Sequence, residues 1–411
     1  MLEAPARLVL IDPATGKALS RLQTWLAMSV MLSGALFVAL VVTAVSPIMH
    51  VLSEYFGQNG HGKLVAYGIA TVPSIGIMIG GPITGWVIER VGSRNFLLAI
   101  FLVFGVSGSA GLYLDNVWLL VATRFVLGVA GAGVVTGTLL MIGEYFDPDT
   151  RARVLGYQGS IGAVAALIII LSAGALADWA GWRAPFAMYF LAFLAFVATA
   201  IAIPKRPAFA DRPPVAQSGS ILSAFAGVWG PLIVIVGLFI GSFMPTLQVS
   251  FLLAANGVLK AANASYVLGA SALMVGVGSA IYGPLRLRMG DRWMLRLAAI
   301  WVGAGIVVMG FSHEAIQVGI GCAISGIGTG LLNPQVNNML LSRGAANARG
   351  RTVGLGYTAR YTGDFLNPVI VGPIAVAVGL HYAFVIVGAA FIVAVGLDLL
   401  SGRATPVMRN A

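Results

Sequence analysis

Uninterrupted apolar runs recur along the whole chain and limit its possible folds more than any other feature. A membrane-spanning helix needs about 20 apolar residues to cross about 30 Å of hydrocarbon. Twelve runs approach or exceed this length: 24–48, 64–87, 96–113, 117–142, 153–177, 184–203, 228–253, 264–285, 294–312, 316–341, 352–378 and 380–400. We therefore predict an all-α membrane protein with twelve transmembrane helices. The even number places both termini on one side of the membrane.

Composition excludes several other classes of protein. Hydrophobic residues make up 59% of the chain and charged residues 9%, against about 45–50% and about 25% in soluble globular proteins. An ordinary soluble enzyme, a disordered protein and a nucleic-acid binder are therefore excluded. The single cysteine, Cys322, excludes a disulfide scaffold. Because the sequence has no cluster with metal-ligand spacing, we expect no metal and no cofactor.

Basic residues concentrate on one predicted side of the membrane. If the N-terminus is cytoplasmic, the cytoplasmic segments hold nineteen of the 24 Lys and Arg residues, and the outer loops hold only Lys63, Arg183 and Lys260. Cytoplasmic loops of membrane proteins carry an excess of Lys and Arg. We therefore predict a multi-pass protein of the cell membrane, or of the inner membrane in a bacterium, with both termini cytoplasmic.

A polar segment containing four prolines follows the sixth run and divides the chain. Proline ends a helix and keeps a linker irregular. We predict a cytoplasmic N-terminal segment, a six-helix bundle, a cytoplasmic linker, a second six-helix bundle and a cytoplasmic tail. These cover residues 1–23, 24–203, 204–227, 228–400 and 401–411.

The two bundles share an internal repeat. The pattern Gly-x4-Arg-x-Gly-x-Arg occurs at 85–94 and again 198 residues later at 283–292. A second pair of similar segments, 151–157 and 349–357, enters the fifth and eleventh runs. Repeated halves predict a pseudo-symmetric protein with its substrate between them, near the midplane of the membrane.

The first copy of the pattern resembles the loop motif of the major facilitator superfamily, Gly-x3-Asp-Arg-x-Gly-Arg-Arg, with Glu89 in place of Asp. Arg124 and Gly128 resemble the Arg-x3-Gly motif of the fourth span, and 144–151 resembles the acidic-Pro-Arg segment after it. The resemblance covers the whole chain. It implies the major facilitator fold and a transporter, not an enzyme.

Segment 178–186 resembles the Gly-Trp-Arg-x2-Phe signature of drug and metabolite exporters in this family. These exporters also carry Gly-Pro-x2-Gly-Gly late in span five, and 168–177 lacks both the proline and the glycine pair. The resemblance therefore indicates the drug and metabolite:proton antiporter group but leaves the direction of transport open.

Charged residues around the first loop motif suggest a gate. We expect Arg90 or Arg94 to pair with Glu144 and to latch the halves in the outward-facing state. The alternative is a set of solvated charges that only follows the topology rule. The candidate gating residues are Gly85, Glu89, Arg90, Gly92, Arg94, Glu144 and Arg151.

Three charged residues lie deep within the spans: Arg124, Arg360 and Asp364. A charge at the bilayer centre costs about 2.5–3.5 kcal/mol even on a lenient scale, so such residues usually serve a function. We predict that Asp364 carries a proton and that Arg360, one turn away, modulates it or binds an anion. The alternative for this pair is a permanent structural ion pair.

Arg124 has two interpretations. The family resemblance associates it with proton transfer in antiporters. The alternative is an interhelical donor to backbone carbonyls.

Uncharged polar and aromatic residues within the spans are candidates for a solute pocket, because such pockets combine apolar walls with a few placed polar groups. Some of them are expected only to hydrogen-bond between helices. The candidates are Gln158, Gln248, Asn333, Asn337, Tyr357, Tyr361 and Asn367. His50 and His61 lie near the outer face, where we expect them to be interfacial rather than ligands.

These observations predict a proton-coupled secondary transporter that exports a small organic solute by alternating access. The alternative is an importer or exchanger of a small organic anion, a carboxylate, bound by Arg124 and Arg360. A membrane enzyme is disfavoured because the spans contain no nucleophile paired with a base. The expected partners are the solute, protons and the lipid bilayer, with no nucleic acid and no obligate protein partner, so we expect a monomer.

Overall fold

The computed structural model describes residues 10, 18–57, 61–204, 229–343 and 349–400. These residues form helices and short connections, without a β-strand among them. The predicted linker 204–227 and tail 401–411 lie almost entirely outside this part, as does most of 1–23. The division into domains therefore stays a prediction.

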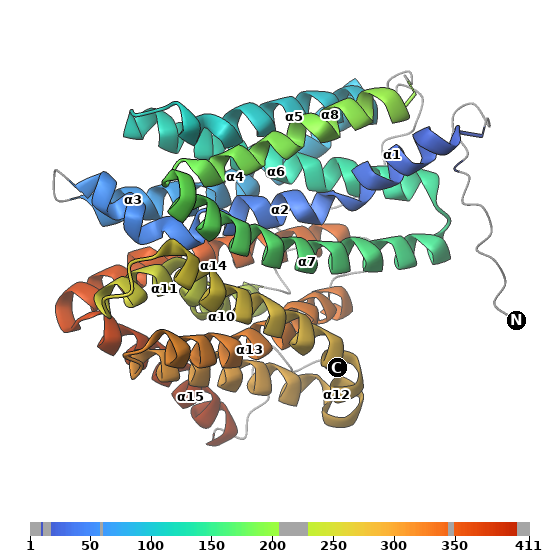
Figure 1. Ribbon diagram of the computed structural model, residues 1–411. Coiled ribbons are helices and arrows are strands. Elements are labelled where there is room, and N and C mark those ends of the chain that lie inside the picture. Colours follow the sequence, from blue (N-terminus) through green and yellow to red (C-terminus); the bar gives the residue numbers. More distant parts are fainter. Residues whose placement is uncertain (1–9, 11–17, 58–60, 205–228, 344–348, 401–411) are drawn as a thin grey trace, which may run out of the picture.

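Helices of the first half run back and forth across one side of the molecule (Figure 1). They are α1 (Arg21–Leu32), α2 (Gly34–Thr43), η1 (Ser46–Ile48), α3 (Met49–Tyr55), α4 (Gly62–Val91), α5 (Ser93–Ser109), η3 (Ala110–Leu112), α6 (Val117–Tyr145), α7 (Pro148–Ala180), η4 (Ala184–Phe190) and α8 (Leu191–Ala202). The first crossing continues to Tyr55, beyond its predicted end at residue 48.

Helices of the second half lie beside the first (Figure 1). They are α10 (Trp229–Ser242), α11 (Met244–Ala255), α12 (Ala261–Gly310), α13 (Ala315–Arg343), α14 (Arg349–Val378) and α15 (Leu380–Leu400). α4 packs against α14 and α7 against α12, which brings the two halves together.

Eleven helical segments in the described part are long and apolar enough to cross a membrane. One of them, α12, has 50 residues and would measure about 75 Å if straight. It is interrupted at Gly290, where φ is 77° and ψ is 166°, and so forms two crossings. The twelve predicted spans are all present, with the eighth and ninth joined at this bend.

The repeat offset of 198 residues reappears in the backbone. Gly92 and Gly290, the central glycines of the two motif copies, both have positive φ, as do Gly181 and Gly379. A side chain at such a φ is sterically unfavourable, so glycine is favoured at each of these turns, where the chain reverses direction. Pro47 and Pro245, again 198 residues apart, stand in or beside the break in the first crossing of each half.

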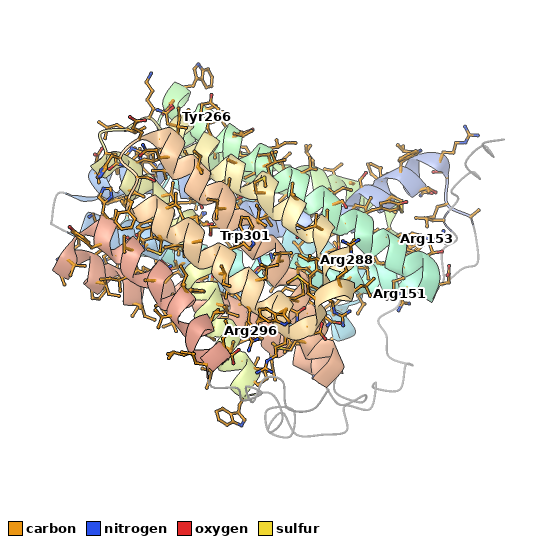
Figure 2. All side chains as sticks on the ribbon, turned by 90° about the horizontal axis from the view of Figure 1, so that it is seen from below. Arg151, Arg153, Tyr266, Arg288, Arg296 and Trp301 are labelled. Atoms are coloured by element: carbon orange, nitrogen blue, oxygen red, sulfur yellow. The ribbon has the colours of Figure 1, made fainter. Side chains whose placement is uncertain are left out.

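The helices run between two ends of the bundle, here named proximal and distal. The proximal end holds Arg21, Gly92, Gly290 and Leu400, and the distal end holds Tyr55, Ala180 and Ala261. Figure 2 shows Arg151, Arg153 and Arg288 at the proximal end, with Tyr266 toward the distal end.

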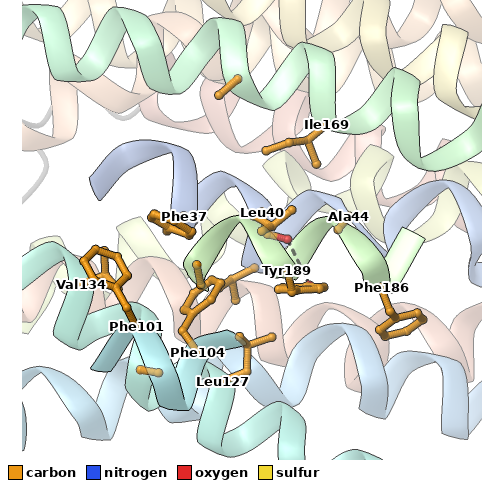
Figure 3. Close-up of a cluster of buried hydrophobic side chains, with 14 of the residues drawn as sticks. Phe37, Leu40, Ala44, Phe101, Phe104, Leu127, Val134, Ile169, Phe186 and Tyr189 are labelled. Carbon is orange, nitrogen blue, oxygen red and sulfur yellow. Dashed lines mark hydrogen bonds between the residues drawn. The ribbon is translucent and has the colours of Figure 1, made fainter. Parts of the chain in front are cut away.

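Aromatic side chains fill the core of the first half (Figure 3). Phe37 of α2 lies 5.2 Å from Phe101 and 5.1 Å from Phe104 of α5, measured between ring centroids. The Tyr189 hydroxyl donates to the Leu40 carbonyl at 3.2 Å. This core binds α2, α5 and η4 into one unit.

Glycines let the backbones of neighbouring helices approach closely within each half. A Cβ on Gly128 of α6 would lie 2.0 Å from the Pro73 carbonyl oxygen of α4. A Cβ on Gly326 of α13, 198 residues later, would lie 2.5 Å from the Ser271 carbonyl oxygen of α12. Small residues at such crossings allow membrane helices to pack in van der Waals contact.

Enlarging these glycines should destabilise the fold. We expect Gly128→Ala and Gly326→Ala each to cost about 1–3 kcal/mol, because the added methyl group must displace the backbone of the neighbouring helix. Gly81→Ala is the matched control, since a Cβ there meets nothing within 4 Å. Thermal unfolding of the purified variants in detergent measures the effect. Equal midpoints for Gly128→Ala and Gly81→Ala would contradict this account of the packing.

Candidate functional site

Asp364 lies near the middle of α14, at the contact between the two halves. Its side chain is 3% exposed. The hydroxyl of Ser74, in α4 of the other half, donates a short hydrogen bond to Oδ2 of Asp364. The other oxygen, Oδ1, is buried and has no hydrogen-bond partner in the described part of the chain. The carboxylate therefore has one atom bonded to the opposite half and one atom available.

Arg360 lies one turn toward the proximal end of α14. No salt bridge joins it to Asp364 among the described side chains, so the two do not form the structural ion pair considered above. The guanidinium instead lies over aromatic rings, 5.1 Å from the centroid of Phe239, 5.8 Å from Phe243 and 5.9 Å from Tyr361. Its Nε is buried and has no hydrogen-bond partner in the same part.

A small cavity opens beside Arg360. Three of the predicted pocket residues line it: Asn333, Asn337 and Tyr357. The cavity volume is about 10 Å³, about enough for one water molecule. Oδ1 of Asn333 is buried without a described partner, while Tyr357 is 47% exposed. A solute larger than water therefore needs this cavity to widen.

Gln248 and Asn367 are occupied by a chain of hydrogen bonds between the halves. The Tyr67 hydroxyl of α4 donates to Gln248 Oε1 at 2.6 Å. Gln248 Nε2 donates to Asn367 Oδ1 at 3.1 Å, and Asn367 Nδ2 donates to the Ile240 carbonyl at 2.7 Å. This chain, with the Ser74–Asp364 bond, connects α4 to α11 and α14. Both side chains therefore bond between helices in this conformation, and their role in a solute pocket stays a prediction.

Gln158 lies inside the first half. Its amide donates to the Met31 carbonyl at 2.7 Å and approaches Thr138 Oγ1 at 3.4 Å. These bonds tie α7 to α1 and α6, away from the cavity beside Arg360.

Arg124 is fully buried in the first half. Its Nη2 donates to the carbonyls of Ser107 and Gly108 at 2.6 and 2.7 Å, and the guanidinium lies 5.1 Å from the Phe186 ring centroid. These contacts are those of the interhelical donor, the second interpretation given above. They do not bring Arg124 to Asp364.

The gating candidates lie at the proximal end, where three contacts join elements of the first half. Ser93 Oγ donates to Glu144 Oε1 at 3.3 Å. Arg94 Nη2 donates to the Ala200 carbonyl at 3.1 Å, and Arg151 Nη2 donates to a carbonyl at the end of α6, that of Gly143, at 2.7 Å. These three contacts hold α5, α6, α7 and α8 together and do not reach the second half.

The remaining gating candidates surround the turn between α4 and α5. Arg90 is exposed and Gly92 makes the turn with φ of 82°. Gly85 lies in α4, but the side chains of Trp86 and Glu89 are outside the described part. The predicted latch between Arg90 or Arg94 and Glu144 stays a prediction.

The second motif copy has no acid at the position of Glu89 but carries one nearby. Leu287 stands at the acidic position of the first copy, and the acid comes instead from Asp291, four residues later. Arg286 Nε donates to Asp291 Oδ1 at 2.5 Å, and Asn338 of α13 donates to the same oxygen at 3.3 Å. The bond from Arg286 holds the pKa of this carboxyl, at the turn outside the spans, below its usual value.

Sequence reasoning missed the partners that α4 presents to the second half. Ser74 and Tyr67 carry no distinguishing signal, since a serine or tyrosine in an apolar span is common and neither belongs to a motif. His50, expected to be interfacial, is instead 4% exposed and bonded to the second half. Only the pairing of α4 with α14 and of α3 with α11 reveals these residues.

A larger apolar cavity of about 960 Å³ lies on the side of the first half. Its lining comes from α2, α7, η4 and α8 and includes Leu36, Val164, Ile168 and Leu194, without a charged residue. Its position along two membrane-spanning helices suits lipid chains rather than a polar solute.

Comparisons with known proteins agree with this architecture. Multidrug resistance protein MdtG of Klebsiella pneumoniae is 25% identical over 381 residues, which is 88% of each chain. Multidrug efflux pump Tap of Mycobacterium bovis is 30% identical over 108 residues, or 26% of each chain.

Two solved structures share the fold. The crystal structure of the nucleoside transporter NupG has a TM-score of 0.71 at 11% identity and covers 93% of this chain and 99% of its own. The peptide transporter POT, solved in complex with sulfate, has a TM-score of 0.71 at 16% identity, covering 93% and 96%.

The profile of the Major Facilitator Superfamily matches residues 31–260, more than half of the chain. Together with twelve membrane crossings in two halves that repeat each other, this match identifies the fold and the kind of protein. The chain belongs to the major facilitator superfamily and is a multi-pass membrane transporter, not an enzyme.

Proposed function

We propose that this transporter is a proton-coupled exporter of a small organic solute, that it works as a monomer, and that Asp364 carries the proton. The observation that carries the proposal is the position of Asp364. It is a buried acid at the contact between the halves, with one oxygen bonded to Ser74 and the other without a described partner.

This geometry links the protonation of Asp364 to the contact between the halves. The ionised carboxylate is the stronger acceptor for the Ser74 hydroxyl, because hydrogen bonds to charged groups exceed neutral ones. Oδ1 is free to receive a proton. Proton binding there weakens the bond between α4 and α14, and so changes the balance between two arrangements of the halves. A rocking transporter needs such arrangements within a few kcal/mol of each other.

Export is supported by the relatives. MdtG and Tap are named as multidrug resistance and efflux proteins, and the exporter signature around Trp182 and Arg183 lies at the distal end. There the Arg183 side chain bonds to Asp115 and to the Gly111 carbonyl at 3.1 Å. These bonds join the segment that follows α5 to the segment that follows α7 at the distal end of the first half.

Both termini are proposed to be cytoplasmic, on the charge distribution of the sequence. The distal end is then the outer face. Hydrogen bonds between the halves that involve His50, Tyr67 and Asp178 cluster toward that end. They support the proposal that this conformation is the one closed toward the outside.

Replacing the proposed proton carrier should abolish the coupling of transport to protons without stopping the movement of solute. We expect Asp364→Asn to abolish proton-driven accumulation in liposomes. Solute counterflow should stay within about twofold of the parent, since the amide preserves the shape and the bond from Ser74. Asp364→Glu, which keeps the acid, is the control and should retain coupling. Accumulation driven by a proton gradient in Asp364→Asn would refute this role.

A second function, exchange or uptake of a small organic carboxylate, is favoured by one specific observation. Arg360 has a buried Nε without a described partner, beside an Asn333 oxygen in the same state. A guanidinium backed by aromatic rings binds planar carboxylates well. Arg124 does not contribute to this anion site, because its contacts lie in the core of the first half.

Ligand-induced stabilisation distinguishes the two functions. A ligand that binds only the folded state stabilises it by about 2.7 kcal/mol at one hundred times its dissociation constant. For an anion carrier, small carboxylates should raise the unfolding temperature of the parent but not of Arg360→Gln. Arg90→Gln removes the same charge at an exposed proximal site and should behave as the parent. Stabilisation by cationic or neutral amphiphiles that depends on Asp364 favours the exporter.

A further inference from the structure

His50 lies on α3 at the distal end, buried between the two halves. Its Nδ1 lies 2.8 Å from Ser250 Oγ of α11, and its Nε2 lies 2.6 Å from the Leu259 carbonyl oxygen. Its backbone N–H also donates to Ser250 Oγ at 3.2 Å. Both partners belong to the second half, so one imidazole ring bonds the halves together at two points.

The hydrogen atoms available in this cluster can be counted. A carbonyl oxygen only accepts, so the bond to Leu259 requires a proton on Nε2 of His50. Ser250 Oγ also lies 3.1 Å from the Pro47 carbonyl oxygen, which likewise only accepts. The single hydroxyl proton of Ser250 therefore serves either Pro47 or Nδ1 of His50, and not both.

A second proton on the ring resolves this competition. With Nδ1 protonated, His50 donates to Ser250 Oγ, and the Ser250 hydroxyl donates to Pro47. Every polar contact of the cluster then has its hydrogen, and two of the bonds become charge-assisted, which roughly doubles their strength. The neutral ring leaves one of the two contacts of Ser250 without a hydrogen, and the imidazolium form supplies it.

We propose that His50 is a second proton-binding site, distinct from Asp364, and that proton uptake there stabilises the closed distal end. The proton comes from solution, adds to Nδ1, and breaks no covalent bond. Closure therefore strengthens as pH falls and weakens as pH rises. The meaning of this site for transport rests on the proposed proton-coupled export, in which a proton taken up outside returns the empty carrier to its inward-facing form.

The internal repeat supports this assignment. The residue 198 positions after His50 is Gln248, which also reaches across the interface, to Tyr67 at 2.6 Å. The same position thus bonds the halves in both repeats, but only the first copy carries an imidazole, whose second ring nitrogen can take up a proton. His50→Gln therefore introduces the side chain that the second half already uses in this place.

Other titratable groups stand on the elements packed around His50. They are Glu54 on α3, His61, Lys63 and Tyr67 on or beside α4, Asp178 at the end of α7, and Lys260 next to Leu259. Asp178 accepts from the backbone N–H groups of Ala261 and Ala262 at 2.9 and 3.0 Å, which caps α12. A pH effect at this end must therefore be assigned by substitution.

Spin labels at Trp118→Cys and Ile316→Cys report the separation of the distal ends in lipid nanodiscs. These positions are 83% and 76% exposed and occupy matching places in the repeat, and the native Cys322 is buried. Between about pH 8 and about pH 5, the range in which histidine changes charge, we expect the closed population of the labelled parent to rise. The ratio of closed to open should increase about tenfold, as neutral bonds become charge-assisted.

His50→Gln should remove this response, and His61→Gln, the exposed distal control, should retain it. Ser250→Ala keeps the histidine but removes the acceptor of its second proton, and should also flatten the response. If His50→Gln fails to fold in a thermal unfolding assay, the pH response of Ser250→Ala tests the proposal instead. A full response in folded His50→Gln, or a parent distance that does not change with pH, would overturn the proposal.

Asp364→Asn in the same labelled protein separates this inference from the proposed function. If it keeps the pH response, the response belongs to the distal site whether or not transport is proton-coupled. If Asp364→Asn loses the response while His50→Gln retains it, the distal site is refuted and the role of Asp364 is supported.

Discussion

Inside hydrocarbon a polar group finds its hydrogen-bond partner within the protein or has none, and this constraint organises the whole molecule. It forces the backbone into helices, since a helix satisfies its own amides and carbonyls. It also explains why buried polar side chains are bonded to backbone carbonyls or to one another. Arg124 is held by two carbonyls of α5, and Asn367 joins Gln248 to the Ile240 carbonyl. Asp364, Arg360 and Asn333 are exceptions, since each has a buried polar atom without a partner in the described structure.

Close backbone contact and separate hydrogen bonds both contribute to the packing of this protein. Within a half, glycines such as Gly128 and Gly326 bring helix backbones into direct contact, and a sliding motion there would cost much packing. Between the halves, a close approach of this kind occurs at Gly174 of α7, where a Cβ would lie 2.7 Å from the Ala261 carbonyl oxygen. The polar contacts there include separate hydrogen bonds from Ser74, Tyr67 and His50. A hydrogen bond contributes about 0.5–1.5 kcal/mol net, so a few of them can exchange during rocking. The two proposed proton sites both lie among these hydrogen bonds.

The structure separates residues that look equivalent in the sequence. Arg124 and Arg360 are both lone arginines in apolar spans, yet one is bonded inside the first half and the other borders a cavity in the second. Gln158 and Gln248 are similar in the same way, and only Gln248 bonds across the halves. Helical periodicity gives the face on which such a residue lies, but not the helix that the face meets.

The sequence by itself determined the twelve crossings, the repeat and the family. Hydropathy and glycine spacing record these directly, because helix formation and close helix packing are local properties. It also indicated Asp364, since an acid deep in an apolar span is conspicuous. Only the tertiary structure decided which polar groups meet, such as Ser74 with Asp364 and His50 with Ser250. Those pairs join residues about 200 to 290 positions apart. The partners are ordinary serines, whose importance arises only where the two halves of the chain meet.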